Sequence, residues 1–265
     1  MILRIHWKHG RRAARSVRLA RLDTLLARME LRPSGRLPEN DAGIGGFLRQ
    51  FQRVPLDRFL SRPARFYNWN HGPPALRPLE APLGSTGRTA ILCAGFQESA
   101  QIRCFPYREA EEVASFAPET LAGPWERLAE LAGLALSKRV DLSCVETALI
   151  PFTGLKHGRL TARERELLWR AFPVPVFEQF RGFGQELLAW ECDAHEGLHI
   201  VEENCFFELE DDGELVLSGL GCEEYNLLRV GTELTARIAT PPCGCGIATP
   251  RLVCLRPREA EAIAV

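Results

Sequence analysis

The first thirty residues show a helical spacing of apolar positions. These positions recur three or four residues apart, as one face of a helix requires, at Leu22, Leu25, Leu26 and Met29. Arginines at 11, 12, 15 and 18 precede the stripe, so the helix predicted for residues 1–30 has one apolar and one basic face. Glycine, proline and asparagine predict a loop at 33–46. We expect the stripe to pack on the core of the protein; the alternative is an arm for a polyanion or an acidic protein.

Helical and strand-like patterns alternate between residues 47 and 188. Short helical pieces are predicted around Pro55, and the proline-rich stretch 68–82 is predicted to be irregular. Helices are predicted at 107–117, at 124–137 and after Thr161, where Glu164 has the capping-box spacing. Apolar runs predict strands at 89–93, 102–105, 144–152 and 173–177. Strand, helix and strand from 144 to 177 imply a parallel pair with a right-handed crossover, so the fold class is α/β.

The pattern changes to short strands after Trp190. Alternating positions predict strands on both sides of Asp212-Gly213, and this dipeptide is typical of a hairpin turn. The last eighty residues therefore predict a small antiparallel β unit. The chain is expected to divide into a basic helix and loop (1–46), an α/β core (47–188) and a β-rich lobe (189–265).

Composition excludes several classes of protein. The chain has 265 residues, of which 46% are hydrophobic and 25% charged, and its 33 Lys and Arg nearly balance its 34 Asp and Glu. These values indicate one or two globular domains and exclude disordered, collagen-like and coiled-coil chains. No apolar run approaches the roughly 20 residues that span a bilayer, and the N-terminus lacks the apolar core of a secretory signal. We expect a cytoplasmic protein with reduced thiols, in which metal binding is the informative use of its nine cysteines.

The residue types that zinc prefers occur together in the β-rich segment. The best candidate ligands are Cys192, His199, Cys243 and Cys245. The last two flank one glycine after two prolines, so both thiols can reach one ion from a tight turn. A β unit too small for a large core gains stability from such an ion. Rival ligands are His195, Cys205 and Cys222, and the alternative is that these residues are ordinary members of the core.

A second candidate is a glycine-flanked turn that can surround phosphate with backbone N–H groups. Its residues are Gly84, Ser85, Thr86, Gly87, Arg88 and Thr89. The turn lacks the Gly-Lys-Ser/Thr ending of a Walker loop, and the alternative is a polar surface turn.

Several uncommon words of sequence recur in a fixed order in the second half of the chain. They are FPVPVFEQF (172–180), AWEC (189–192), GLHIVEE (197–203), LRVG (228–231), PCGCG (242–246) and PRL (250–252). Over residues 144–252 the chain thereby resembles the phenylacetate-coenzyme A ligase branch of the acyl-adenylate-forming enzymes. Residues 48–68 resemble the lead-in to the phosphate loop of that family, and 84–89 resemble the loop itself, Gly-Thr-Thr-Gly-Lys-Pro.

The resemblance implies an adenylation-domain-like layered sheet with helices and a small β lobe. Such enzymes bind ATP and magnesium, join a carboxylate to AMP and pass the acyl group to coenzyme A. Some members of the branch hold zinc at the positions that match Cys192, His199, Cys243 and Cys245. The resemblance therefore favours a structural zinc, and it favours phosphate binding at 84–89.

The chain departs from the family where the family binds the nucleotide. A Tyr-Gly-x-x-Glu motif, whose Glu serves magnesium, is replaced by Phe180, Arg181, Gly182, Phe183 and Gly184. The next carboxylate is Glu186. The Asp that holds the ribose is replaced by Thr232, followed by Glu233, and the Gly-Gly-Glu turn is replaced by 153–158, which includes His157. These departures argue against ATP, AMP and magnesium as cofactors.

Two further departures concern length. The sequence stops at Val265, where the family continues into a domain with the lysine that stabilises adenylation, and no lysine follows Lys156. The stretch between the phosphate loop and Phe152 is also short, so part of the acyl pocket is expected to be absent.

Two functions follow from the resemblance and the departures. The first is a truncated, non-catalytic relative that acts as a binding or accessory protein with a structural zinc. The alternative is an ATP-dependent carboxylate-CoA ligase that works with a lysine domain on another chain. A protein partner or a small carboxylate is expected in the first case, and neither nucleic acid nor a membrane is expected as a partner.

Overall fold

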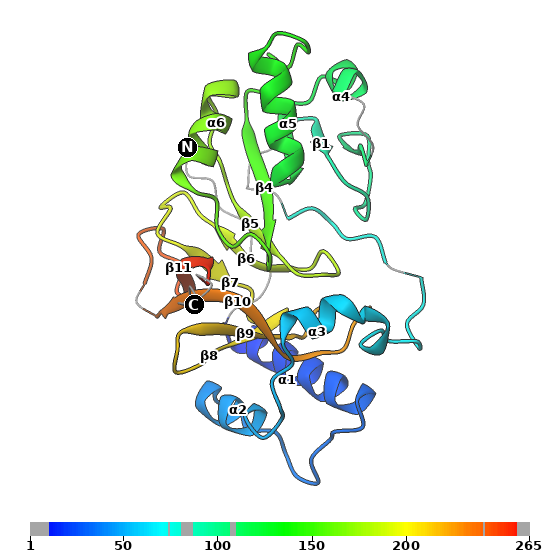
Figure 1. Ribbon diagram of the computed structural model, residues 1–265, viewed down its shortest axis with the longest axis vertical. Coiled ribbons are helices and arrows are strands. Elements are labelled where there is room, and N and C mark those ends of the chain that lie inside the picture. The colour runs from blue at the N-terminus through cyan, green and yellow to red at the C-terminus, as the bar shows by residue number, and fades with distance from the viewer. Residues whose placement is uncertain (1–10, 74, 81–86, 107–109, 241, 259–265) are drawn as a thin grey trace, which may run out of the picture.

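Residues 11–73, 75–80, 87–106, 110–240 and 242–258 are described by a computed structural model of the chain (Figure 1). Its helices are α1 (Arg11–Arg28), α2 (Asp41–Leu48), α3 (Leu56–Ser61), the short 3-10 helix η1 (Pro63–Arg65), α4 (Ala110–Phe116), α5 (Trp125–Leu136) and α6 (Ala162–Ala171). No helix within these residues is long and apolar enough to cross a membrane.

The strands of the described residues form one eleven-stranded sheet in the order β2-β1-β3-β4-β5-β6-β7-β11-β10-β9-β8. Their bounds are β1 (Thr89–Ile91), β2 (Ile102–Cys104), β3 (Thr120–Pro124), β4 (Ala148–Gly154), β5 (Gln179–Arg181), β6 (Leu187–Glu191), β7 (Leu198–Ile200), β8 (Cys205–Leu209), β9 (Glu214–Gly219), β10 (Leu227–Ala239) and β11 (Arg251–Pro257).

The sheet changes from parallel to antiparallel at β5. Strands β2, β1, β3, β4 and β5 are parallel to one another, and β6 begins the antiparallel part by pairing with β5. Helices α4, α5 and α6 belong to the parallel part, where Leu128 and Leu168 are buried with Leu121 and Leu149 in one apolar cluster. The carboxyl ends of β4 and β5 therefore lie near the middle of the sheet, where the two parts meet (Figure 1).

Most of the predicted elements are confirmed. Helix α6 begins at the predicted capping box, in which the Thr161 side chain accepts from the Glu164 N–H and Glu164 accepts from the Thr161 N–H. Strands β4 and β5, which flank α6, are parallel, although the second strand of the expected pair was placed at 173–177. The predicted hairpin is present as β8 and β9 around Asp212-Gly213. The α/β fold class is thus correct for the parallel part, and an antiparallel sheet follows it.

Two predictions of secondary structure were wrong. Residues 173–177 are not a strand but make a single parallel bridge, Leu149 to Val176, because Pro173 and Pro175 have no N–H to donate to a ladder. The loop predicted at 33–46 contains the start of α2, which Asn40 caps by accepting from the Gly43 N–H at 2.7 Å.

Strand β3 was not predicted, since its sequence TLAGP combines a glycine with a proline.

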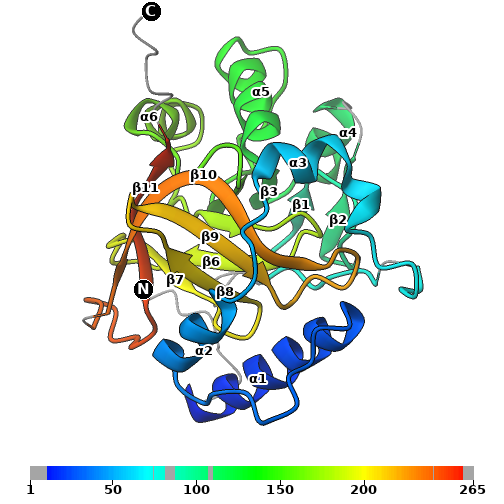
Figure 2. The same ribbon diagram turned by 60° about the horizontal axis from the view of Figure 1, so that its bottom comes forward.

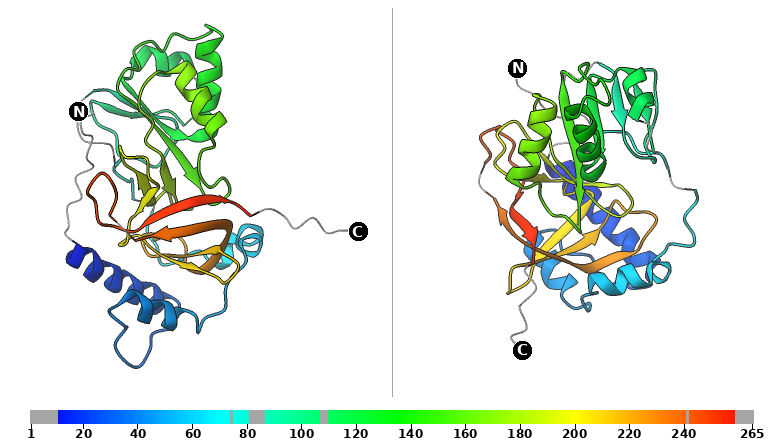
Figure 3. Two further views of the ribbon diagram at one scale, coloured as in Figure 1. Left: turned by 90° about the vertical axis from the view of Figure 1, so that its left-hand side faces the viewer. Right: turned by 45° about the horizontal axis from the view of Figure 1, so that its top comes forward.

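The N-terminal helix packs on the protein, as expected. Leu22, Leu25 and Leu26 are fully buried, in one cluster with Ile44 and Leu48 of α2 and with Phe206, Leu220 and Leu228. Figure 2 shows α1 and α2 beside β8, so the surface that they cover belongs to the antiparallel part of the sheet. Figure 3 shows these two helices at the end of the molecule opposite α5 and α6.

Several arginines of α1 are bound within the chain. The Arg18 guanidinium, which is almost fully buried, donates to Glu202 at 3.2 Å and also pairs with Asp41. Arg21 donates to the backbone oxygen of Glu203 at 2.8 Å. These contacts fix α1 against the turn between β7 and β8.

Candidate functional site

The structure brings together the four cysteine and histidine residues predicted as metal ligands. The ligand atoms of Cys192, His199, Cys243 and Cys245 all lie within 4.8 Å of one another. The Sγ atoms of Cys192 and Cys243 are 3.6 Å apart, and the Cys245 Sγ is 3.4 Å from the His199 Nε2. Four donors that converge in this way can hold a metal ion.

Three adjacent segments of the sheet position these ligands. Cys192 follows the end of β6, and His199 lies in β7, opposite Trp190 of β6 and opposite Arg251 of β11. The turn with Cys243 and Cys245 precedes β11, and the Gly246 N–H donates to the Cys243 oxygen at 2.8 Å. The pairing of β6, β7 and β11 thus brings ligands from distant parts of the sequence to one point.

Two contacts around the cluster were not predicted. The His199 Nδ1 lies 2.9 Å from the Thr249 hydroxyl oxygen, which leaves the Nε2 atom turned toward the sulfur atoms. Glu196 accepts from the Gly244 N–H at 3.2 Å and from Arg251 at 2.9 Å, so it joins the two loops that hold the ligands. No spacing in the sequence relates either Thr249 or Glu196 to the cluster, because their side-chain contacts join residues 48 to 55 positions apart.

The cluster is shielded from water. Cys192, His199 and Cys243 are buried, and Cys245 is half-buried. Burial lowers the pKa of His199 to about 4, which keeps the imidazole neutral and its lone pair available to an ion. Burial likewise raises the pKa of Cys192 to about 12, so in the protein without metal this thiol is protonated.

The rival ligands lie elsewhere. The His195 ring stacks on Phe177, and its Nδ1 is 3.3 Å from Glu191. The Cys205 thiol donates to the backbone oxygens of Leu188 and Val201, and Cys222 belongs to a separate apolar cluster.

The predicted phosphate turn is only partly within the described residues. Gly84, Ser85 and Thr86 lie outside them. Gly87 and Arg88 precede β1, Thr89 is its first residue, and the Arg88 Nε donates to the Ala117 oxygen at 2.9 Å. Phosphate binding at Gly84, Ser85, Thr86, Gly87, Arg88 and Thr89 stays a prediction.

A cavity of about 280 Å³ lies at the carboxyl ends of β4 and β5. Both segments that replace nucleotide motifs of the resembled family contribute to its lining, 153–157 from one side and 181–183 from the other. Trp125 and Glu126 at the N-terminus of α5 complete this wall. Clefts at the carboxyl ends of parallel strands are common ligand sites, so this cavity is the second candidate site.

The Arg181 guanidinium is fixed at the wall of this cavity. It lies 4.4 Å from the centre of the Phe152 ring and 4.9 Å from that of Phe96. It donates to Glu80 at 2.8 Å and to the backbone oxygen of Gln185 at 2.6 Å. Arg181 is 3% exposed, so its charge is held in place by the protein itself.

His157 also has a structural partner. Its Nε2 is 3.2 Å from Glu164, and its ring stacks on Trp125 with 6.0 Å between the ring centres.

The candidate substitutes for the two missing carboxylates do not face the cavity. Glu186 is 1% exposed and is not among the lining residues; its Oε2 accepts from the Gly184 N–H at 2.9 Å. The Thr232 hydroxyl donates to the Leu215 oxygen at 2.6 Å, which makes it part of the β10–β9 pairing. The Glu233 N–H donates to Glu214 at 3.4 Å.

The burial of Glu186 has a consequence for stability. Burial raises its pKa from 4.5 to about 7, against the opposing effects of nearby backbone N–H groups and the charge of Arg77. A raised pKa means that the neutral carboxyl stabilises the fold: this contribution is complete below pH 4.5 and is lost as the pH rises through about 7.

The variant Glu186→Gln is therefore expected to be more stable than the natural protein at pH 8, by about 3 kcal/mol in the free energy of unfolding. Most of the difference should disappear at pH 5, because both side chains are then neutral. Denaturant unfolding at the two pH values measures this, with the exposed Glu39→Gln as control. An equal difference at both pH values would contradict the assignment.

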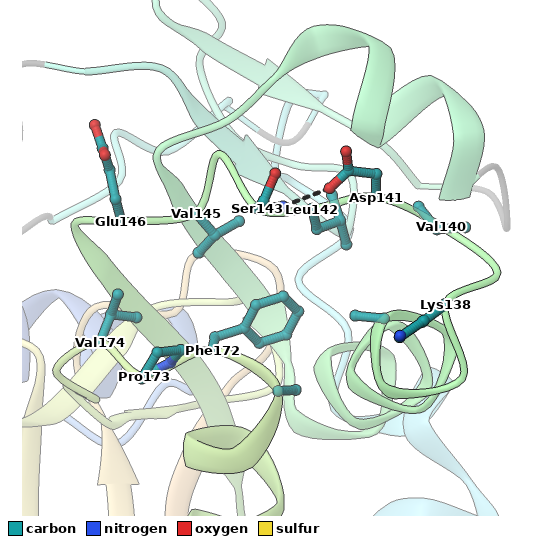
Figure 4. Close-up of a pocket in the computed structure, with 12 residues that line it drawn as sticks. Lys138, Val140, Asp141, Leu142, Ser143, Val145, Glu146, Phe172, Pro173 and Val174 are labelled. Atoms are coloured by element: carbon teal, nitrogen blue, oxygen red, sulfur yellow. Dashed lines mark hydrogen bonds between the residues drawn. The ribbon is translucent and has the colours of Figure 1, made fainter.

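A larger cavity, of about 670 Å³, lies at the amino end of β4 (Figure 4). It is bounded by the end of α5, the loop 138–146 and the residues 171–174 that follow α6. In Figure 4 Phe172, Val145 and Leu142 form its apolar wall, and Asp141 accepts from the Ser143 N–H at 3.0 Å. None of the residues predicted for a site lines this cavity.

The fold is similar to solved structures of CoA ligases. No protein-family model matches the sequence, and no curated protein is similar to it in sequence. The structure of 2-hydroxyisobutyryl-CoA ligase with 2-HIB-AMP and CoA in the thioesterification state is similar over 92% of this chain and 68% of the ligase, with 12% identity and a TM-score of 0.59. An open conformation of the same ligase is similar over 63% of this chain and 44% of the ligase, with 13% identity and a TM-score of 0.50.

These values show the fold and no more. The chain spans less than half the length of the ligase in its open conformation. The expected likeness to the adenylate-forming ligase fold is confirmed.

Proposed function

We propose that this chain is a non-catalytic binding or accessory protein that has kept the adenylate-forming fold and is stabilised by zinc. The observation that carries the proposal is the position of Arg181. In the family that the chain resembles, this position belongs to the Tyr-Gly-x-x-Glu motif, next to the nucleotide. Here its guanidinium is clamped between Glu80 and two aromatic rings at the wall of the corresponding cavity.

The surroundings of Arg181 support the loss of adenylation. Magnesium-dependent adenylation needs carboxylates aimed at the metal and at the ribose, because the enzyme stabilises charge with groups that are already in position. Glu186 is turned into the protein, and Thr232 is hydrogen-bonded to Leu215. If each lost contact contributes about 2 kcal/mol, the loss of both lowers the rate roughly 10³-fold.

The geometry of the four-ligand cluster supports zinc. In a tetrahedron with zinc–sulfur distances of about 2.3 Å and a zinc–nitrogen distance of about 2.0 Å, two sulfurs lie about 3.8 Å apart and a sulfur and a nitrogen about 3.5 Å apart. The corresponding separations are 3.6 Å between Cys192 and Cys243 and 3.4 Å between Cys245 and His199. Four protein ligands leave no open position, so the ion would be structural.

The lining of the cavity at the carboxyl ends of β4 and β5 supports a small carboxylate as ligand. Its lining includes the cations Lys156 and Arg181 beside the single carboxylate of Glu126, together with the rings of Trp125, Phe152 and Phe183. A cavity of about 280 Å³ suits a small ligand.

The absence of adenylation is tested by pyrophosphate release. The purified chain with ATP, magnesium and a panel of aryl and fatty acids is expected to release no pyrophosphate above the rate of heat-denatured protein. An active CoA ligase in the same buffer is the positive control. Release that follows the protein through a second purification step would overturn the proposal and would favour the ligase alternative.

A further inference from the structure

A groove of about 520 Å³ lies between α6 and the extended segment 174–176. Its charged and aromatic lining residues are Arg159, Arg165, Glu166, Trp169, Glu191 and His195, and Val176 belongs to the segment that forms one wall. None of these residues belongs to the four-ligand cluster or lines the cavity at the carboxyl ends of β4 and β5. The groove is therefore a separate feature.

One wall of the groove is the outer edge of the segment at Val176, a residue that is 9% exposed. Leu149 of β4 pairs with the segment 174–176: its N–H donates to the Pro175 oxygen, and its oxygen accepts from the Phe177 N–H, both at 2.9 Å. Backbone groups of successive residues in a strand point to opposite sides, so the N–H and C=O of Val176 point away from β4. Among the described residues neither group has a hydrogen-bond partner.

The strand that would cover this edge ends too early. β6 lies on the far side of β5, and its last residue, Glu191, donates its N–H to the Glu178 oxygen at 2.9 Å. The chain then turns, with the His195 N–H donating to the Cys192 oxygen. An unpaired strand edge is a template for the backbone of another extended chain.

The opposite wall of the groove offers an exposed ring. Trp169 is 54% exposed, and it lies one helical turn after Arg165 on α6. An exposed indole beside a strand edge is suited to cover an apolar side chain. The ring and the edge are therefore together suited to a peptide, which offers both a backbone and an apolar side chain.

The end of the groove holds two guanidinium groups with unused donors. Glu178 and Glu191, both buried, accept from the Nε and Nη2 of Arg159 and from the Nη2 of Arg165. Within the described chain the Nη1 atoms of both arginines and the Nε of Arg165 make no hydrogen bond. The arginines are 22% and 27% exposed. Glu178, Glu191 and the nearby Glu166 balance their charge, so it is the free N–H groups that can donate to a carboxylate that enters the groove.

We propose that this groove binds an extended peptide segment of a partner protein by adding it to the edge at Val176. An apolar side chain of the segment packs on Trp169, and a carboxylate of the segment accepts from Arg159 and Arg165. The proposal does not depend on the loss of adenylation or on the cavity beside Arg181.

The test uses fluorescein-labelled tetrapeptide mixtures and fluorescence polarisation on the full chain. The first mixture ends in Leu, Phe or Trp with a free C-terminal carboxylate and is randomised at the other positions. The second is the same mixture with a C-terminal amide. The third is an amide mixture with aspartate as last residue, which distinguishes a side-chain carboxylate from a terminal one.

We expect either the first or the third mixture to bind at least 10-fold more tightly than the second, which has no carboxylate at its last residue. Trp169→Ala should weaken that binding at least 10-fold, and Trp69→Ala should not, because Trp69 is also exposed but does not line the groove. Backbone N-methylation of the selected peptide should abolish binding, because it blocks pairing with Val176. Absence of binding by all mixtures, equal binding of carboxylate and amide, or indifference to Trp169→Ala would overturn the proposal.

Discussion

The purified protein is expected to contain one zinc ion per chain, and Cys243→Ser is expected to lose that zinc and most of its stability. The cause is that metal binding energy is part of the folding energy wherever the ligands come from separate segments. A structural zinc contributes on the order of 10 kcal/mol in small peptides, which is comparable with the whole stability of a typical domain. Metal analysis and thermal unfolding measure the two effects.

The chain offers a matched control for this variant. Cys254 is an exposed cysteine in β11, the strand that follows the ligand turn, and Cys254→Ser should keep both the zinc and the melting temperature. Chelation of the natural protein should reproduce the effect of Cys243→Ser. A metal-free preparation of full stability, or a Cys243→Ser variant with unchanged zinc content, would sink the assignment.

Shortening one buried leucine of α1 is expected to lower the free energy of unfolding by about 3 kcal/mol. The variant is Leu25→Ala, which leaves a hole between α1, α2 and the antiparallel strands because Leu25 is fully buried. Deletion of residues 1–30 should cost more, since it uncovers the whole cluster and leaves Glu202 buried without Arg18. Denaturant unfolding measures both effects.

An exposed residue of the same helix is the control for the leucine variant. Thr24 is exposed, and Thr24→Ala should change the free energy of unfolding by less than about 0.5 kcal/mol. If α1 were an independent arm, Leu25→Ala would behave like Thr24→Ala, and deletion of the arm would leave the melting temperature unchanged. That result would favour a salt-sensitive partner of the arginines instead.

Local signals made part of the fold predictable. The leucine stripe of α1, the Thr161 capping box and the Asp212-Gly213 turn each depend on neighbours in sequence, and each was read correctly. Elements that depend on pairing with residues distant in sequence were not predicted. β3 exists because β1 and β4 lie on both sides of it, and its own residues do not favour a strand.

The candidate sites show the same division. Residue type and spacing, together with the resemblance, selected four residues whose ligand atoms the fold brings within 4.8 Å. The partner of Arg181 could not be found in this way, because Glu80 is a hundred and one positions away in sequence. The Val176 edge was also hidden, since residues 173–177 predicted a regular strand and the prolines leave only one bridge.

Calorimetric titration of the zinc-loaded chain with ATP and magnesium tests whether nucleotide binding has been lost from a fold that is otherwise kept. We expect no heat of binding beyond dilution, because the Arg181 guanidinium is fixed at the wall of the cavity, Glu186 is turned into the protein, and Glu126 is the one carboxylate among the described lining residues. Saturable binding of one ATP per chain that requires magnesium would contradict it.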